Sequence, residues 1–362
     1  MKIGIIGTRG IPNNYGGFEQ FAQYLSVGLT EKGHEVFVYN SHNHLYKEDK
    51  WKGVNIIHKY DPEFKIGTAG QFIYDLNCIL DSRKRKFDII LNLGYTSSSI
   101  WGKFFPKKTV LITNMDGLEW KRTKFSKRVQ KFLLYAEKLA TIHSDVLIAD
   151  SIGIQKYITD KYNKQSHYIA YGADLFESPD ESILKEYNLS PFQYNMLIAR
   201  IEPENNIELI LDGIHASSKK DIFLVIGNYK NNFGQYLFEK YKSNEHIKFM
   251  GPIYNINVIN NLRYYSNLYF HGHSVGGTNP SLLEAMASSG LIVAHDNDFN
   301  KSILNEDAFY FTTPDDIKKT VESNPVKNQY SGFIKNNCKK IKLIYSWKNI
   351  IDQYEQVMLN SL

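Results

Sequence analysis

Short apolar runs alternate with helical stretches along almost the whole chain of 362 residues, and this alternation is the feature that most constrains the fold. A succession of strand, helix and strand is typical of doubly wound parallel sheets. The chain is long enough for two such domains. The expected strands span residues 3–6, 35–39, 54–58, 87–91, 109–113, 146–149 and 167–170, followed by 195–199, 222–226, 247–250, 268–270 and 291–294.

The boundary between the two series is predicted near residue 173. After Tyr171-Gly172-Ala173-Asp174 the sequence becomes a polar, proline-containing connector at residues 178–181. This predicts a first α/β domain at residues 1–172 and a second at residues 173–338. Residues 339–362 favour an amphipathic helix, whose apolar face is made by Leu343, Trp347, Ile350, Ile351 and Tyr354.

Composition argues against several classes of protein. The two cysteines, Cys78 and Cys338, have neither a pairing nor a metal-site spacing, which suits a reducing compartment. No apolar run approaches the ~20 residues that span a bilayer, and the first residues do not form a signal-peptide pattern, so a soluble cytoplasmic protein is expected. The net charge of +5 is too small to indicate nucleic acid by itself.

A glycine-bearing loop at residues 7–17 connects the first expected strand to the first expected helix. Its glycine spacing differs from the dinucleotide-binding fingerprint, and the second strand ends in Asn40, where an NAD enzyme has an acid. An NAD dehydrogenase is therefore the least favoured interpretation. The loop can instead place backbone amides and Arg9 near a bound ligand.

Residues 271–287 carry the strongest functional signal. Two adjacent glycines, Gly276 and Gly277, precede Asn279 as an N-cap and Pro280 at the first helical position. An open helix N-terminus behind a glycine loop attracts anions, and Glu284, one turn further, could accept hydrogen bonds from two ribose hydroxyls. Together these groups describe a site for a nucleotide diphosphate. A capped helix with a solvent-facing glutamate explains the same motif equally well.

Two charged residues follow strands at the expected ligand-binding edge. Arg200, after the first strand of the second domain, suits charge stabilisation of a leaving diphosphate, but it could also be a surface partner of Glu202 or Glu204. Asp116, after a strand of the first domain, could hold a substrate hydroxyl or stabilise positive charge. It could equally form a turn before Gly117.

The sequence contains no metal-ligand spacing and no Gly-x-Ser-x-Gly elbow, so neither a metal centre nor a serine nucleophile is indicated. His271 and His273 flank a glycine without a helical or paired context. They are interpreted as structural residues.

A basic segment, residues 121–132, contains six cationic and no acidic residues. Phe125, Val129, Phe132 and Leu133 fall on one helical face with the cations around it. This pattern fits binding to an anionic membrane surface. An ordinary solvated helix with its apolar side in the core would have the same pattern.

Taken together, these motifs resemble retaining GT-B glycosyltransferases over essentially the whole chain. The resemblance rests on the paired domains, on residues 16–19, 171–174 and 280–286, and on Arg200. More narrowly, residues 7–12 and 276–280 look like the bacterial rhamnosyltransferase branch that builds capsule, O-antigen and cell-wall polysaccharides. The implied fold is GT-B, with two Rossmann-like domains facing across a cleft and a C-terminal helix that crosses back to the first.

The resemblance implies a role for each matching position. The first domain would bind the acceptor and the second the nucleotide sugar. Arg200 and Asp116 are expected in catalysis, and Arg9, Tyr95, Glu119 and Trp120 on the acceptor side. The expected donor-binding residues are Gly16, Gly17, Arg200, Asn205, Tyr254, Gly276, Gly277, Thr278, Asn279 and Glu284.

Two departures from the family pattern bear on activity. Gly276 stands where the wider family usually has a second glutamate, and Asn205 where it often has a lysine. The family's frequent catalytic histidine is also absent, and Asp116-Gly117 occupies that neighbourhood. These changes fit a specialised deoxysugar donor. They also leave open a non-catalytic sugar-binding relative, and a GT-B-fold epimerase or hydrolase remains a further alternative.

The expected reaction is transfer of L-rhamnose from dTDP-β-L-rhamnose to a saccharide or polyprenyl-linked glycan, with the anomeric configuration retained. Another UDP- or GDP-sugar is the alternative donor. The nucleotide sugar is a co-substrate, and neither a cofactor, a metal nor a nucleic-acid partner is expected. The basic segment is expected to hold the enzyme at the inner face of the cell membrane.

Overall fold

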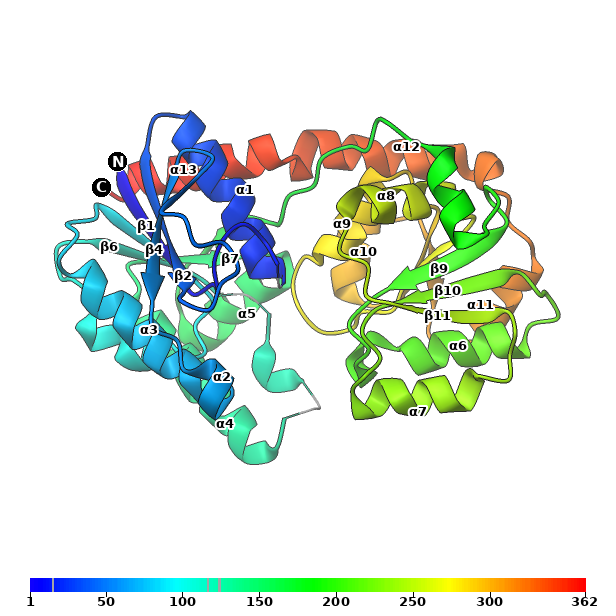
Figure 1. Ribbon diagram of the computed structural model, residues 1–362, viewed down its shortest axis with the longest axis horizontal. Coiled ribbons are helices and arrows are strands. Elements are labelled where there is room, and N and C mark those ends of the chain that lie inside the picture. The colour runs from blue at the N-terminus through cyan, green and yellow to red at the C-terminus, as the bar shows by residue number, and fades with distance from the viewer. Residues whose placement is uncertain (15, 116, 123–124) are drawn as a thin grey trace. The chain divides into compact units, whose positions relative to one another are not determined.

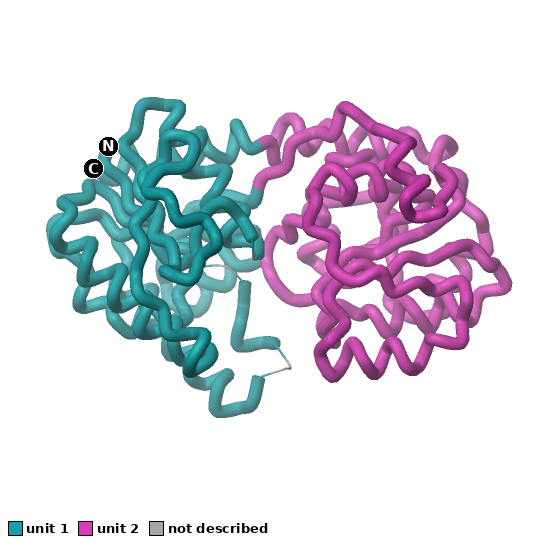
Figure 2. The backbone as a smooth tube through the Cα atoms, in the orientation of Figure 1, with its two compact units in different colours: residues 1–171, 347–362 teal, residues 172–346 magenta. Residues whose placement is uncertain are grey.

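The computed structural model describes residues 1–14, 16–115, 117–122 and 125–362 (Figure 1). The chain divides into two compact units, each built around its own sheet (Figure 2). Unit 1 contains residues 1–171 and 347–362, and unit 2 contains residues 172–346.

Unit 1 has an eight-stranded sheet in the order β3-β4-β2-β1-β5-β6-β7-β8, in which only the β3–β4 pairing is antiparallel among the described strands. Its buried strands read as nearly continuous apolar runs, because helices cover both faces of a parallel sheet. The strands are β1 (Lys2–Ile6), β2 (Glu35–Ser41), β3 (Lys50–Trp51), β4 (Val54–Lys59), β5 (Ile89–Leu93), β6 (Val110–Asn114), β7 (Val146–Ala149) and β8 (His167–Tyr168). The helices are α1 (Gly17–Glu31), α2 (Glu63–Ile66), α3 (Ala69–Ser82), α4 (Lys127–His143), α5 (Ile152–Tyr162) and α13 (Trp347–Asn360), with 3₁₀ turns η1 (Ser99–Phe104) and η2 (Glu119–Lys121).

Unit 2 has a six-stranded parallel sheet in the order β11-β10-β9-β12-β13-β14. Its core gathers buried side chains such as Leu197, Phe223 and Phe270. The strands are β9 (Tyr194–Ile198), β10 (Ile222–Ile226), β11 (Ile247–Gly251), β12 (Tyr269–His271), β13 (Ile292–His295) and β14 (Phe309–Phe311). The helices are α6 (Ile207–Ala216), α7 (Asn232–Tyr241), α8 (Ile256–Tyr265), α9 (Pro280–Ala287), α10 (Asp298–Leu304), α11 (Pro314–Glu322) and α12 (Ser331–Lys340), with shorter turns η3 (Glu181–Tyr187), η4 (Pro203–Asn205), η5 (Lys327–Tyr330) and η6 (Ile341–Tyr345).

The predicted fold class, two α/β domains with parallel sheets, is confirmed. All twelve expected strands form. The prediction lacked β3 and β14, which lie at the edges of the two sheets and contain only two and three residues. Such short strands carry too few residues for a periodicity signal.

The stretch expected as one helix over residues 339–362 is divided by Ser346 into η6, a π-helical turn, and α13. Trp347, Ile350, Ile351 and Tyr354 are buried as expected, but Leu343 is 60% exposed. The prediction for Leu343 was wrong because the wider π turn and the break change the phase of the apolar face. α13 belongs to unit 1, although all of unit 2 precedes it in the sequence.

Candidate functional site

The strand order of unit 2 reverses between β9 and β12. From β9 the sheet continues through β10 and β11 on one side, and from β12 it continues through β13 and β14 on the other. β9 and β12 are parallel neighbours, so the loops that follow them leave the same edge of the sheet. Ligands of open α/β sheets bind at such a topological switch point.

Direct contacts join the two loops at this point. The backbone N–H and the hydroxyl of Ser274 both donate to the carbonyl oxygen of Glu204, at 3.3 and 2.7 Å. The Asn206 amide donates to the carbonyl oxygen of Gly272 at 2.8 Å. A Cβ at Gly272 would lie 2.1 Å from the carbonyl oxygen of Asn205, so this close approach requires glycine. The loop after β12 is therefore held in place by the loop after β9.

Helix α9 begins as the sequence predicts. Asn279 is its N-cap, and its side-chain oxygen accepts from the Ser281 N–H at 2.9 Å. Pro280 occupies the first helical position. Gly276 has φ +129°, a conformation that residues with a side chain rarely adopt, and the space beside it is open. The loop therefore needs glycine at this position. Thr278 is buried, and Gly277 and Asn279 are partly buried.

Glu284, the predicted ribose ligand, is anchored by a residue that sequence reasoning missed. Its Oε2 lies 2.7 Å from the guanidinium of Arg263 on α8, whose side chain is only 1% exposed. Arg263 also donates to the hydroxyl of Ser281 at 3.1 Å and to Asn260 at 3.2 Å, and its guanidinium lies over the Tyr269 ring. The sequence signal for Arg263 is a cation four residues after the apolar Ile259, on the same face of the helix.

Arg200 lies beyond the end of β9 and is exposed. Asn205, expected as a donor ligand, is buried, and its side chain donates to the carbonyl oxygen of Arg200 at 2.7 Å. Asn205 thus shapes the backbone turn that presents Arg200. Tyr254, expected near the base, follows β11 and is 79% exposed.

His271 ends β12 and is fully buried. Its ring stacks on that of His273 with the centroids 4.4 Å apart. Burial holds the pKa of His271 well below its ordinary value, so it is neutral at physiological pH. Among the described residues, no three His, Cys, Asp or Glu side chains lie close enough to hold a metal ion.

In unit 1 the loop after β1 is organised by Glu19 of α1. This buried carboxylate accepts from the Arg9 N–H at 2.9 Å and from the Thr8 hydroxyl at 3.3 Å. Gly16 is the N-cap of α1, and a Cβ there would lie 3.3 Å from the Glu19 carboxylate. Gly17 opens the helix and is exposed.

Of the other residues predicted on the acceptor side, Tyr95 is buried, and Glu119 and Trp120 are partly buried. The hydroxyl of Tyr95 lies 3.4 Å from the carboxylate of Glu137, which also accepts from Tyr157 at 2.7 Å. Trp120 packs against Tyr157, and Glu119 pairs with Arg122 at 2.7 Å. Asp116 lies outside the described residues. Glu137 was missed because it is an unremarkable acidic position in the helix sequence.

The basic segment, residues 121–132, is partly explained by packing. Phe132 contacts the ring of Phe72 with centroids 5.8 Å apart, and Leu133 is buried. Lys127, Arg128 and Lys131 are exposed on the first turns of α4. None of the helices in the described part of the chain is both long and apolar enough to cross a bilayer.

Sequence comparisons divide the chain at a similar place. Residues 1–174 match a domain of unknown function (DUF1972), and residues 188–324 match the family Glycosyl transferases group 1. No curated protein matches the chain.

Solved glycosyltransferase structures share the fold over the full length. Sucrose-phosphate synthase (tll1590) from Thermosynechococcus elongatus superposes with a TM-score of 0.78 at 15% identity, covering 99% of this chain and 98% of that one. Anabaena Alr3699/HepE, solved with UDP and glucose, gives 0.77 at 15% identity and covers 100% of both chains. A glycosyltransferase from Rickettsia africae gives 0.73 at 12% identity, with 99% and 97% covered. The chain thus has the GT-B-like fold of these glycosyltransferases, and its unit 2 contains the stretch that matches the group 1 glycosyltransferase family.

Proposed function

We propose that this enzyme transfers a sugar from a nucleotide diphosphate sugar to a saccharide acceptor with retention of the anomeric configuration, and that dTDP-β-L-rhamnose is its donor. One observation carries the proposal. At the switch point of unit 2, an open helix N-terminus, a glycine loop and a carboxylate anchored by a buried arginine lie together. These groups match the phosphates and ribose of a nucleotide diphosphate.

Each group has a distinct task in the proposed reaction. The amides of Gly276, Gly277 and Thr278 bind the diphosphate, and Glu284 accepts hydrogen bonds from the ribose hydroxyls. Tyr254 offers an exposed ring on which the base stacks. Arg200 stabilises the charge that develops on the leaving diphosphate.

In the proposed mechanism the acceptor hydroxyl attacks the anomeric carbon on the face from which the diphosphate departs. The bond from the anomeric carbon to the phosphate oxygen breaks, and a leaving phosphate oxygen takes the acceptor's proton. The products are a glycoside and a nucleoside diphosphate. Arg200 and the N-terminus of α9 supply positive charge at the leaving group, so we expect turnover to persist in EDTA.

The acceptor is proposed to be a lipid-linked saccharide at the inner face of the cell membrane. The exposed cations of α4 support this placement, because Lys127 and Arg128 lie at a helix N-terminus, where positive charge is unfavourable. Cations that lower the stability of their own helix fit a role in binding an anionic membrane.

A donor screen tests the proposed function. Purified protein is heated with dTDP-rhamnose, UDP-glucose or a GDP-sugar, and a donor at about 100 times its dissociation constant should add roughly 2.7 kcal/mol of stability. The stabilising donor is then incubated with and without saccharide acceptors, and the product anomer is assigned by NMR. Stabilisation by UDP-glucose alone would overturn the rhamnose assignment. Conversion of the donor without an acceptor would favour an epimerase or hydrolase. Donor binding without any product would favour a non-catalytic relative.

Arg200→Ala tests the mechanism directly. We expect turnover to fall by about 10²–10³, because one charge-stabilising group is lost from the transition state. Arg83→Ala, which removes an exposed arginine at the end of α3, is the matched control and should retain parental turnover. Equal turnover in Arg200→Ala and Arg83→Ala would remove Arg200 from the mechanism.

A further inference from the structure

Lys327, in the turn η5 of unit 2, is a buried lysine that contacts the end of helix α8. Its ammonium donates to the carbonyl oxygen of Tyr264 and lies 3.5 Å from that of Ser266. The ring centroids of Phe192 and Tyr264 lie 5.4 and 5.2 Å from the same ammonium. The last carbonyl groups of an α-helix have no partner within the helix, and the helix dipole favours a cation beside them. Lys327 therefore caps the C-terminus of α8.

Two neutral partners complete this cap. The hydroxyl of Tyr194 donates to the carbonyl oxygen of Leu262 at 2.7 Å, and the hydroxyl of Ser266 donates to that of Arg263 at 2.8 Å. The N–H of residue 192 donates to the carbonyl oxygen of residue 265 at 2.7 Å. Every carbonyl oxygen at positions 262–266 thus has a partner, and Lys327 serves two of the five. A helix end whose carbonyl groups are all bonded resists fraying.

The cap contains two unfavourable features. Burial lowers the pKa of Lys327 to about 7, because the ammonium loses its water. Phe192 has a φ of +60°, which is rare for a large side chain. An apolar residue in place of Lys327 and a glycine in place of Phe192 would avoid both costs. Unfavourable features that lie together in this way indicate that the end of α8 has a task beyond packing.

Helix α8 carries the arginine that orients Glu284. Arg263 directly precedes Tyr264, so Lys327 holds the turn of the helix from which the Arg263 side chain extends. The guanidinium of Arg263 lies 2.7 Å from Glu284 and donates to the hydroxyl of Ser281 at 3.1 Å, and both partners belong to α9. The two helices lie side by side (Figure 1). Direct contacts therefore lead from Lys327 through the last turn of α8 to Glu284.

We propose that Lys327 is a positioning residue for the donor site. It holds the last turn of α8, and Arg263 then fixes the Glu284 carboxylate in the direction that the ribose hydroxyls require. The inference rests on the proposed function, because Glu284 is the proposed ribose ligand. Residues 188–324 match the glycosyltransferase group 1 family, so Lys327 lies beyond the family's pattern.

Lys327→Met tests the proposal, because methionine keeps an apolar chain between the two rings and removes the ammonium. Binding of dTDP, UDP and GDP to the full chain is measured by calorimetry at about pH 6, below the pKa of Lys327. We expect the affinity for the nucleotide that binds the parent best to fall about tenfold. Hydrogen exchange of peptides from α9 should become faster without any nucleotide, because Glu284 is held less firmly.

A double-mutant cycle separates positioning from a general loss of stability. In a background that carries both Arg263→Met and Glu284→Gln, the link to the carboxylate is absent and no buried cation is left unpaired. Adding Lys327→Met to this background should speed up exchange in α8 but leave nucleotide affinity and α9 exchange unchanged. A further loss of affinity of about tenfold in this background would overturn the proposal, because Lys327 would then act without Arg263 and Glu284.

Lys240→Met is the matched control. Lys240 pairs with Glu208 and Asp212 at 2.7 and 2.9 Å, so this substitution removes a lysine that ties α7 to α6. The variant should keep the parental nucleotide affinity. Equal losses of affinity in Lys240→Met and Lys327→Met would also overturn the proposal, since any weakened lysine contact of unit 2 would then have the same effect.

Failure of the proposed function gives a different pattern of results. If the parent binds none of the three nucleotides, the donor site is contradicted, and hydrogen exchange still decides the role of Lys327. Faster α9 exchange in Lys327→Met, seen in the parent but not in the Arg263→Met and Glu284→Gln background, would uphold the link from Lys327 to Glu284. Unchanged α9 exchange in Lys327→Met would overturn this link, whichever nucleotide binds.

Discussion

At the level of single residues, the proposed donor site depends on an ion pair between the buried Arg263 and Glu284. Arg263 is one of the largest fully buried side chains of the described residues, and Glu284 is its carboxylate partner. A buried charge that loses its partner costs far more than the pair contributes when intact. The same contact sets the direction of the carboxylate proposed to bind ribose.

Stability and donor binding can be separated at this pair. Glu284→Gln should leave Arg263 without its counter-charge, destabilise unit 2 by about 3–5 kcal/mol and weaken donor binding. Adding Arg263→Met removes the stranded cation, so stability should largely return while donor affinity stays low. Hydrogen exchange of peptides from α8 and α9 measures the change in stability, and titration with the donor measures the change in affinity. Recovery of donor affinity in the double variant would show that Glu284 does not contact the ribose.

A buried carboxyl in unit 1 predicts a pH dependence of stability. Burial raises the pKa of Asp75 from 3.8 to about 7, and Ser97 donates to this carboxyl at 2.5 Å. Between pH 4 and pH 7 the folded state keeps a proton that the unfolded state releases, so this group makes stability fall as pH rises. Above pH 7 the carboxyl is ionised in both states, so its effect on the free energy of unfolding no longer changes with pH.

Asp75→Asn should remove this contribution. The variant should gain up to about 4 kcal/mol over the parent at pH 8, and much less at pH 4.5. All four tryptophans (Trp51, Trp101, Trp120 and Trp347) belong to unit 1, so their fluorescence reports its unfolding alone. Asp160→Asn, at an exposed position, is the control and should show no such trend. A pH-independent difference between Asp75→Asn and the parent would contradict the assignment.

At the level of elements, α4 combines a packed face with an exposed cationic one. Phe132 and Leu133 lie toward the interior, whereas Lys127, Arg128 and Lys131 are exposed. The interpretation as a helix with a packed apolar side therefore holds for one face of α4. The packed face is a structural finding, and membrane binding by the cationic face is a proposal.

Changing Lys127, Arg128 and Lys131 to Glu should reduce co-sedimentation with anionic vesicles about a hundredfold at low salt, at about 1 kcal/mol per cation. High salt should also weaken binding of the parent protein to these vesicles, because it screens the charges. The fold should gain stability, because acidic residues suit a helix N-terminus. The control changes three exposed lysines of α11 and α12, Lys319, Lys335 and Lys339, to Glu. Equal losses of vesicle binding in both triple variants would show that net charge alone, and not the cationic face of α4, causes the binding.

At the level of the whole molecule, unit 1 is completed by the last helix of the chain. Trp347 stacks on Tyr24 of α1 with ring centroids 4.5 Å apart, and the hydroxyl of Tyr354 accepts from Asn114 at 2.9 Å. Gly28 of α1 lets Ile351 approach closely, since a Cβ there would lie 2.3 Å from the Ile351 Cδ1. The chain must therefore finish α13 before unit 1 has its full core.

Gly28→Ala tests this packing against helix propensity. Alanine favours a helix by about 1 kcal/mol over glycine, but the clash with Ile351 should cost about 1–3 kcal/mol and lower the stability of unit 1. In an Ile351→Val background the Cδ1 atom is gone, so the same substitution should become neutral or stabilising. Tryptophan fluorescence during urea unfolding gives the coupling energy. If the two substitutions changed the free energy of unfolding additively, the close contact between positions 28 and 351 would be contradicted.

The sequence by itself determined the elements and their order, because those signals are local. Asn279-Pro280 predicts the start of α9 through capping chemistry, and apolar runs predict the strands through periodicity. Both act between residues within one or two turns of each other. The position proposed for the donor site rests on the same local signals, since parallel strands end at a common edge.

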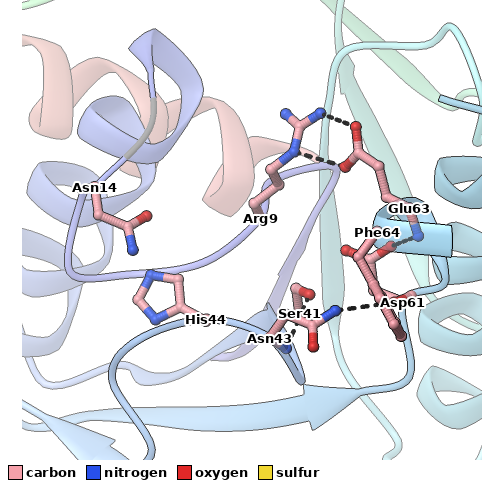
Figure 3. A pocket seen from close by; sticks show the side chains of 8 residues that line it. All are labelled: Arg9, Asn14, Ser41, Asn43, His44, Asp61, Glu63 and Phe64. Atoms are coloured by element: carbon pink, nitrogen blue, oxygen red, sulfur yellow. Dashed lines mark hydrogen bonds and ion pairs between the residues drawn. The ribbon is translucent and has the colours of Figure 1, made fainter. Parts of the chain in front are cut away.

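Only the tertiary structure decided which side chains meet. Arg263 anchors Glu284, the hydroxyl of Tyr95 lies beside Glu137, and Arg9 is paired with Glu63 (Figure 3). In each case the partners belong to different elements, so no spacing along the chain encodes the contact. Leu343 shows the same limit in a helix, where one π turn changed which residues the core covers. Local propensities thus specify the secondary structure, whereas packing between distant elements specifies the chemistry of the sites.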